Sequence, residues 1–248
     1  MSTLDDLSVL DGEAARVAVV IDARAHERFA RYLALLEEWD GRAGLTAITD
    51  PAEVQRRHFG ESLALLAVLR AEGLLPVGEA RALADLGTGA GFPGLPMLIA
   101  EPALRLTLIE SNGRRCRFLE TVAQELALDG VRVVQSRAEE AGRDPALRAT
   151  FDVVVARALA ALPVLVEYAL PLLQEDGVLA APKGSRADEE RAEAEAALRA
   201  LGGTVLASRP LPLDPSMPPQ VVLLVRRSGP LDDRYPRRAG LPTQRPLR

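Results

Sequence analysis

Residues 83–101, LADLGTGAGFPGLPMLIAE, are a glycine-rich stretch that directly follows an apolar run. Gly87, Gly89 and Gly91 allow backbone with positive φ and let a ligand lie against the main chain. Counted from Gly89, the spacing of Gly89, Gly91 and Gly94 also satisfies the G-x-G-x-x-G pattern of dinucleotide-binding turns. The stretch therefore predicts a strand-to-helix turn that binds a cofactor through its backbone.

Two acidic residues help to choose the cofactor. Asp85 ends the apolar run, where a dinucleotide would place its pyrophosphate and where a carboxylate would repel it. S-adenosylmethionine has no phosphate, and the same carboxylate would attract its ammonium and sulfonium groups. Glu110, at the end of the next predicted strand, can accept hydrogen bonds from both ribose hydroxyls. The charges favour S-adenosylmethionine, although the glycine spacing alone also fits a nicotinamide-dependent oxidoreductase.

Short apolar runs alternate with helical segments from residue 79 to residue 228. The runs RALADLG, LRLTLIES, VRVVQSR, FDVVVAR and DGVLAAPKG predict a doubly wound, mostly parallel α/β sheet, which binds ligands beyond the carboxyl ends of its strands. The last two runs, GTVLASRPL and QVVLLVRR, are joined by PLPLDPSMPP, which is too short and irregular for a crossover helix. We expect these two to pair antiparallel at one edge.

Residues 1–78 have a helical pattern and are predicted to form an N-terminal helical module. Apolar residues recur at helical spacing in EAARVAVVIDARAHERFARYLALLEEWD, and Tyr32 and Trp39 are expected in the core of this module. A further helix is predicted to begin at Pro51, with Asp50 as its N-cap.

The composition predicts a soluble cytoplasmic protein. The chain of 248 residues is 48% apolar, but no run approaches the roughly 20 apolar residues that a membrane span requires. The N-terminus carries acids where a secretory signal carries positive charge. Cys116 is the only cysteine and there are two histidines, so we expect neither a disulfide nor a metal site. Cys116 is predicted to be a small buried side chain.

Several segments resemble the bacterial 16S ribosomal RNA guanine-N7 methyltransferases, the glucose-inhibited division protein B family. They are DLGTGAGFPGLP, TLIESNGRRCRFLETV, VVQSRAEE, FDVVVARALAALPVL and YPRRAGLPTQRPL. The resemblance runs from about Gly44 to the C-terminus, with Gly44 in place of the family's Asn and FGES in place of its FLDS. It implies a Rossmann-like class I S-adenosylmethionine-dependent methyltransferase whose substrate is 16S rRNA or the small ribosomal subunit. We expect the protein to be a monomer.

The resemblance also implies where the cofactor binds. It puts contacts at Gly87 and Phe92 in the turn, at Ala138 and Glu139 after the third strand, and at Arg157 after the fourth. With the turn and the strand ends included, the expected cofactor site consists of Asp85, Gly87, Thr88, Gly89, Gly91, Phe92, Glu110, Ser111, Ala138, Glu139 and Arg157.

Arg157 and Lys183 are the predicted catalytic residues. Arg157 follows the fourth strand, where a cation can hold guanine O6 or a phosphate, and a salt bridge to a neighbouring acid is the alternative. Lys183, in APKG after the fifth strand, is expected to face the same cleft and bind RNA phosphate. His58 is a further candidate for RNA contact, although a helical histidine is more often packed or simply exposed.

The chemistry is consistent with what the sequence lacks. Methylation of an exocyclic amine usually uses an Asn/Asp-Pro-Pro-aromatic turn after the fourth strand, but that strand here continues into ARALAAL. Pyrimidine C5 methylation needs a cysteine nucleophile, and Cys116 lies within a predicted helix. Guanine N7 carries a lone pair and no proton, so direct attack on a methyl group needs alignment and electrostatics but no base.

A chain of net charge −5 must gather its cations on one face to bind RNA. The C-terminal tail, residues 229–248, is the predicted face, with Arg237 and Arg238 as contacts, and Arg56, Arg57 and Arg137 are expected around the cleft. A solvated, disordered terminus is the alternative for the tail. A ribosome-binding protein that has the fold without the activity is the third reading of the whole chain.

Overall fold

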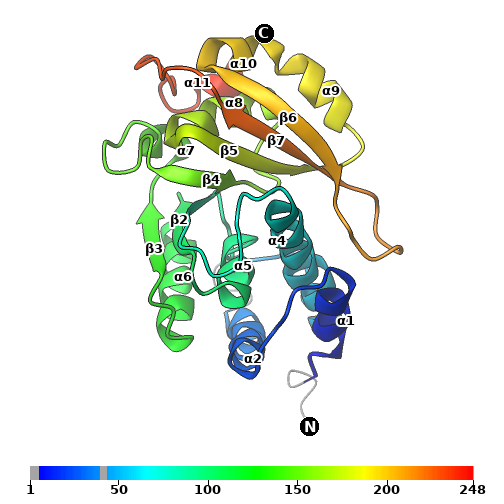
Figure 1. Cartoon of the computed structure of the whole chain (residues 1–248). Coiled ribbons are helices and arrows are strands. Elements are labelled where there is room, and N and C mark those ends of the chain that lie inside the picture. The colour runs from blue at the N-terminus through cyan, green and yellow to red at the C-terminus, as the bar shows by residue number, and fades with distance from the viewer. Residues whose placement is uncertain (1–5, 40–43, 248) are drawn as a thin grey trace.

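The computed structural model describes residues 6–39 and 44–247. Within these ranges the strands form one sheet in the order β3-β2-β1-β4-β5-β7-β6 (Figure 1). The strands are β1 (Ala82–Leu86), β2 (Arg105–Glu110), β3 (Val131–Gln135), β4 (Phe151–Val155), β5 (Leu173–Lys183), β6 (Gly203–Pro210) and β7 (Val221–Arg227). Strands β1 to β5 pair in parallel, whereas β7 pairs antiparallel with both β5 and β6. The predicted parallel sheet with an antiparallel edge is confirmed.

Helices cover both faces of the sheet (Figure 1). One face carries α1 (Ser8–Arg16), α2 (Ala23–Glu38), α4 (Glu61–Ala71), α5 (Gly94–Ala100) and α6 (Gly113–Glu125). The other carries α7 (Ala138–Ala141), α8 (Leu162–Ala169), α9 (Ala187–Glu193), α10 (Glu195–Leu201) and α11 (Leu241–Gln244). Three short helical turns complete the set: α3 (Pro51–Val54), a π-helical turn (Gln55–Gly60) and a 3₁₀ turn (Leu170–Leu172).

The central strands are apolar on both sides because each face of the sheet is covered. Leu83 and Val153 point into one buried cluster, whereas their neighbours Ala84 and Val154 point into the other. This alternation follows from the period of two along a strand. It explains why these strands read as continuous apolar runs in the sequence.

The N-terminal helices share their core with the sheet. Tyr32 on α2 is fully buried, and its ring lies 5.4 Å from the Phe59 ring and 5.5 Å from the Phe92 ring. Its hydroxyl donates a hydrogen bond to the carbonyl of Ala90 in the glycine turn. The helices therefore support the turn directly.

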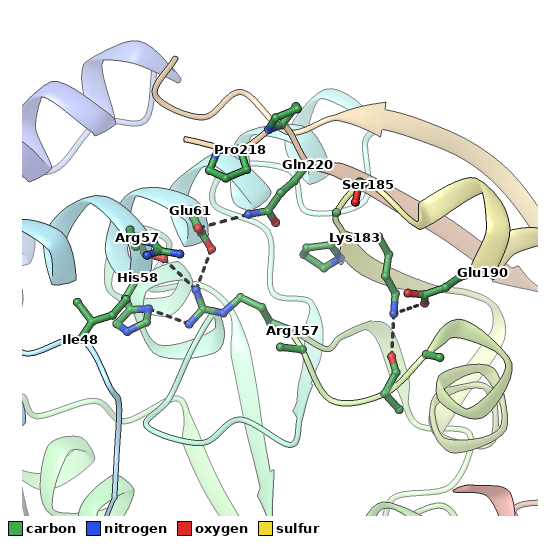
Figure 2. Close-up of a pocket in the computed structure, with 16 residues that line it drawn as sticks. Ile48, Arg57, His58, Glu61, Arg157, Lys183, Ser185, Glu190, Pro218 and Gln220 are labelled. Atoms are coloured by element: carbon green, nitrogen blue, oxygen red, sulfur yellow. Dashed lines mark hydrogen bonds and ion pairs between the residues drawn. The ribbon is translucent and has the colours of Figure 1, made fainter. Parts of the chain in front are cut away.

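The helix starts follow from local capping. Asp50 accepts a hydrogen bond of 2.9 Å from the amide of Glu53, and Pro51 occupies the first helical position, as predicted. From there the chain passes through the π-helical turn into α4, which places His58 and Glu61 on the same side of the helix toward the sheet's carboxyl edge (Figure 2). No helix in the described ranges is both long and apolar enough to cross a membrane.

The described part of the tail, residues 229–247, packs against the protein. Tyr235 and Leu247 lie against the cluster around α8, and Pro236 and Pro242 are buried. The alternative of a disordered terminus is thus not what the structure shows.

Candidate active site

The glycine turn has the geometry that its sequence predicts. Gly87, Gly89 and Gly91 have φ angles of 69°, 62° and 101°, which side chains rarely tolerate. A Cβ atom on Gly87 would lie 2.6 Å from Cδ1 of Leu159, whereas one on Gly89 would meet nothing within 4 Å. Gly87 is therefore required by both its backbone and its neighbour, and Gly89 by its backbone alone.

Asp85 differs from expectation in what it contacts. Its carboxylate is fully buried and accepts hydrogen bonds from the Thr88 hydroxyl at 2.6 Å and from the Gly94 amide at 2.8 Å. Burial raises the pKa of Asp85 to about 6, against the lowering effect of these two hydrogen bonds. Asp85 does not line either of the two cavities described below. Its Oδ2 holds the two ends of the turn together, whereas its Oδ1 is buried and has no hydrogen-bond partner among the described residues. The ionic contact of Asp85 with the cofactor stays a prediction.

A cavity of about 660 Å³ opens beyond the carboxyl ends of β1, β2 and β3. Of the residues expected to bind the cofactor, it is lined by Gly87, Glu110, Ser111, Ala138, Glu139 and Arg157. Thr88, Gly89, Gly91 and Phe92 do not line it. They form the turn itself, and Phe92 is buried against Tyr32 and His58 instead.

Glu110 is oriented by backbone amides. Its Oε2 accepts a hydrogen bond from the Gly89 amide at 3.0 Å, and its Oε1 accepts one from the Asn112 amide at 2.8 Å. The carboxylate is buried but borders the cavity, so it can still accept bonds from ribose hydroxyls. The bare backbone at Gly87 and this fixed acceptor fit S-adenosylmethionine. Cys116 is buried behind Glu110, as predicted.

A second cavity, of about 790 Å³, adjoins the first (Figure 2). The charged and titratable residues that line it are Arg57, His58, Glu61, Arg157, Lys183 and Glu190. The two cavities share Arg157, Ala158, Ala160 and Ala161, in the segment that follows β4. The segment from 157 to 161 is therefore the partition between them, and we call it the partition segment.

Arg157 is fixed at one end of the partition segment. Its Nη1 donates to Glu61 Oε2 and to the Arg57 carbonyl, each at 3.0 Å, and its Nη2 lies 3.0 Å from His58 Nδ1 (Figure 2). Its guanidinium also lies over the Phe92 ring, 5.4 Å from the centroid. Both interpretations of Arg157 thus have support, because it forms the salt bridge and also borders both cavities.

His58 is uncharged in this site. Burial and the neighbouring Arg157 lower the pKa of His58 to about 3. Its ring stacks on Phe92 with centroids 4.5 Å apart, and its Nε2 lies 2.8 Å from the Thr46 hydroxyl. It lines the second cavity, so it stays a candidate for RNA contact, but as a flat ring and not as a cation.

Lys183 is held by two groups of the protein. Its Nζ donates to the Ala160 carbonyl at 2.7 Å and pairs with Glu190 Oε2 at 2.8 Å, and its side chain is 10% exposed. The same Glu190 oxygen accepts a hydrogen bond from the Leu162 amide at 2.8 Å. Lys183 and Glu190 thus clamp the far end of the partition segment. Because Lys183 also lines the second cavity, its contact with an RNA phosphate stays a prediction.

Arg237 also differs from expectation. Its guanidinium forms a bidentate pair with Glu167, which is fully buried on α8, and its contact with RNA stays a prediction. Arg137 and Arg238 are exposed, and Arg137 lies at the rim of the first cavity. For these two arginines RNA contact stays a prediction.

Sequence reasoning missed the partners of the predicted cations. Glu61, Glu167 and Glu190 each hold one of them, and Thr46 holds His58. The sequence does indicate that Glu167 has a partner, because a single acid inside the apolar helix LPVLVEYA needs a cation when it is buried.

Comparison with known proteins decides the family. The model of the family described as rRNA small subunit methyltransferase G matches residues 25–211. The chain belongs to this family. A ribosomal RNA small subunit methyltransferase G of Desulfitobacterium hafniense is 41% identical over 94% of this chain and 93% of its own. Another member of the family, from Roseiflexus castenholzii, is 42% identical over 92% and 94%.

Solved structures agree on the fold of this rRNA small subunit methyltransferase G family member. A SAM-dependent methyltransferase from Aquifex aeolicus matches with a TM-score of 0.53 and 19% identity, over 72% of this chain and 94% of its own. The class I methyltransferase fold is confirmed. The comparisons support neither the oxidoreductase alternative nor the non-catalytic one.

Proposed function

We propose that this protein transfers a methyl group from S-adenosylmethionine to N7 of a guanine in 16S rRNA of the small ribosomal subunit. The observation that carries the proposal is the pair of adjoining cavities that share the partition segment. The cavity at the glycine turn holds the cofactor, and the cavity at Arg57 and His58 receives the base. When bound, S-adenosylmethionine supplies a methyl group activated by the sulfonium charge.

The residues of the base cavity do not offer a general base. His58 is too acidic to hold a proton at neutral pH, because its pKa is lowered to about 3. Glu61 is paired with Arg157, and Glu190 is paired with Lys183. Guanine N7 has no proton to lose, so a site of this kind suits its chemistry. The protein contributes alignment, with Arg157 in position to hold guanine O6 or a phosphate.

Charge in the cavity supports the same reaction. As the methyl group moves, positive charge leaves the sulfur and appears on the guanine ring. The neutral state of His58 avoids repulsion of that charge, and the pair of Glu61 with Arg157 adds no net positive charge to the cavity. The exposed face of the His58 ring can stack on the base, because its other face is occupied by Phe92.

The experiment uses small ribosomal subunits that lack the modification. The protein is incubated with these subunits, or with naked 16S rRNA, and methyl-labelled S-adenosylmethionine. Mass spectrometry of the digested RNA should find 7-methylguanosine in one oligonucleotide. A methyl group on an exocyclic amine or a ribose would refute the proposed mechanism. The comparison of subunits with naked RNA identifies the substrate.

We further propose that the protein acts as a monomer in the cytoplasm.

A further inference from the structure

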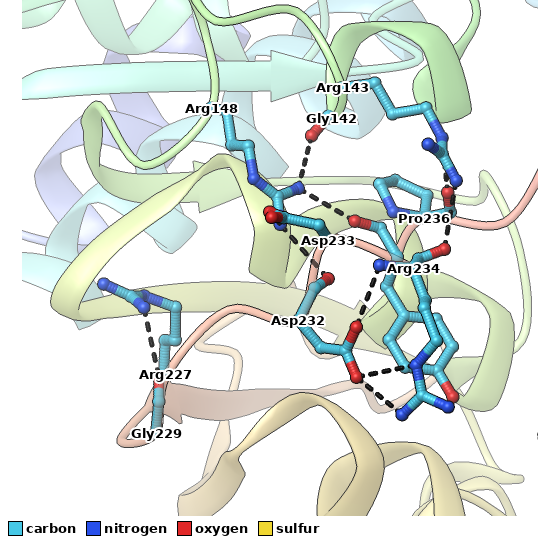
Figure 3. Close-up of polar contacts among 10 residues, drawn as sticks. Gly142, Arg143, Arg148, Arg227, Gly229, Asp232, Asp233, Arg234 and Pro236 are labelled. Carbon is cyan, nitrogen blue, oxygen red and sulfur yellow. Dashed lines mark hydrogen bonds and ion pairs between the residues drawn. The ribbon is translucent and has the colours of Figure 1, made fainter.

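The C-terminal segment, residues 229–247, is held in place by arginines of the main domain (Figure 3). Arg143 donates to the carbonyls of Pro236 at 2.7 Å and of Arg234 at 3.0 Å. Arg148 donates to the Tyr235 carbonyl at 2.8 Å. These hydrogen bonds are made to main-chain carbonyls, so they fix the position of the backbone and not only that of a side chain. The segment therefore follows one fixed course from β7 toward α7 and α8.

The strongest anchor of this segment is the pair between Arg237 and Glu167. Nε of Arg237 lies 2.8 Å from Oε1 and Nη2 lies 2.7 Å from Oε2, and the Arg237 amide also donates to Oε1 at 2.8 Å. Nη2 further donates to the Arg245 carbonyl at 2.8 Å, which closes the segment into a loop. Because Glu167 is fully buried, removing Arg237 would leave a buried carboxylate without its cation.

The loop that this anchor closes reaches the cofactor cavity. The Gly240 amide donates to Glu139 Oε1 at 2.8 Å. The Tyr168 hydroxyl lies 3.2 Å from the same oxygen and 2.9 Å from the Thr243 hydroxyl. Gly240, Thr243 and Pro246 line the cavity together with Tyr168. Oε1 of Glu139 thus accepts one hydrogen bond from α8 and one from the C-terminal segment.

The sheet order indicates which end of the cofactor meets this wall. Glu110, at the end of β2, is the acceptor suited to the ribose, and β1 with the glycine turn lies on one side of it. β3 lies on the other side, and Glu139 follows β3. A ligand that extends from the turn across Glu110 therefore ends with its adenine beside Glu139, Tyr168 and the C-terminal segment.

We propose that the C-terminal segment is a wall of the cofactor cavity at its adenine end, and that Arg237 and Glu167 are positioning residues for cofactor binding. This inference rests on the proposed function, since it takes the cavity to be the S-adenosylmethionine site. The segment lies outside residues 25–211, which the family model matches, although its YPRRAGLPTQRPL stretch is among those that resemble the family. The inference also reverses the sequence-based expectation that Arg237 acts on RNA alone.

The test compares neighbouring arginines by titration calorimetry. Arg237→Met should raise the Kd for S-adenosylmethionine at least tenfold, and raise the Kd for 5′-methylthioadenosine by a similar factor, because this ligand keeps the adenosine part. Arg238→Met, at an exposed position, should stay within twofold of the wild type. Thr243→Val, which removes only a hydroxyl group, should give a smaller increase in both Kd values and covers the case in which Arg237→Met does not fold.

Two further measurements separate the possible failures. In the wild type, 5′-methylthioadenosine should slow hydrogen exchange of the Gly240 amide, an effect that a merely structural segment would not show. Glu110→Ala tests whether S-adenosylmethionine binds in this cavity at all, because Glu110 lines it away from the C-terminal segment. If Glu110→Ala loses binding while folded Arg237→Met and Thr243→Val bind normally, the wall is refuted and the proposed function stands. If all three bind normally, the cofactor binds elsewhere and both proposals fail.

Discussion

Nη2 of Arg157 lies 3.0 Å from Nδ1 of His58, so the guanidinium, which can only donate, fixes Nδ1 as an acceptor. The single ring proton then resides on Nε2, which lies 2.8 Å from the Thr46 hydroxyl. These two contacts favour the neutral imidazole ring of His58. Protonation of Nδ1 would place its new proton against Arg157.

The first prediction concerns stability below pH 6.5. The pKa of His58 is about 3 in the fold and ordinary when unfolded, so the stability it contributes is lost as the pH falls below about 6.5. His58→Gln should therefore gain stability relative to the wild type on acidification, by at most about 1.4 kcal/mol per pH unit. Urea unfolding at pH 7, 6 and 5 measures this difference.

His26→Gln is the matched control for that series, because His26 is a partly exposed histidine on α2, away from Arg157. Asp85 acts in the opposite direction: its pKa is raised to about 6, so its carboxyl stabilises the fold as the pH falls from 6 toward 4. The wild type should consequently show a flatter pH profile than either His58→Gln or Asp85→Asn. A profile of His58→Gln parallel to that of the wild type would contradict the assignment.

The second prediction concerns Lys183. Because its ammonium clamps the Ala160 carbonyl, Lys183→Met should lower the methylation rate at least tenfold through a displaced partition segment. The dependence of RNA binding on salt should remain that of the wild type, since no phosphate contact is lost. Filter binding at several salt concentrations and single-turnover rates measure the two quantities. Arg186→Met, in the exposed part of the same loop, is the control. A flatter salt slope for Lys183→Met would restore the original phosphate role.

The third prediction distinguishes two glycines with the same backbone conformation. Gly89→Ala should cost only the strain of a left-handed residue, about 1 kcal/mol, because its Cβ meets nothing within 4 Å. Gly87→Ala adds a clash with Leu159 of the partition segment, and should also raise the Kd for S-adenosylmethionine more than tenfold. Thermal unfolding and calorimetry of the two variants provide the comparison. Equal effects would mean that the contact with Leu159 is irrelevant.

The fourth prediction concerns two adjacent arginines in the π-helical turn. Arg57 is exposed and lines the base cavity, whereas Arg56 is paired with Glu53. Arg57→Ala should reduce the slope of log K against log salt for RNA binding by about one unit, and Arg56→Ala should leave it unchanged. The result would be contradicted if both variants gave the same slope.

The sheet could be predicted from sequence because its signals are local. The glycine turn, the alternation of apolar runs and the irregular linker before β7 each follow from a few neighbouring residues. The acidic strand end at Glu110 was placed correctly at the cavity for the same reason. These features depend on backbone geometry that nearby residues determine.

The partners of Arg237 and Arg157 could not be assigned from sequence because they lie far along the chain, whereas Glu190, the partner of Lys183, lies nearby in the sequence. Arg237 meets Glu167 across 70 residues, and Arg157 meets Glu61 across 96. A cluster of arginines looks alike whether it faces solvent or fills buried sites. The hydrogen bonds of Asp85 within its own turn could not be foreseen for a related reason, since a strand-end acid can turn inward to its loop as readily as outward to a ligand.

The shared partition segment has a thermodynamic consequence. One side chain, Arg157, borders both cavities and so offers a route by which the two ligands can affect each other's binding. If the cofactor displaces Arg157 and thereby changes RNA affinity by some factor, RNA must change cofactor affinity by the same factor. The stability of the complex with both ligands therefore cannot be calculated from the affinity of each ligand measured alone. The sign of this reciprocal effect would show whether bound cofactor and bound RNA strengthen or weaken each other's binding.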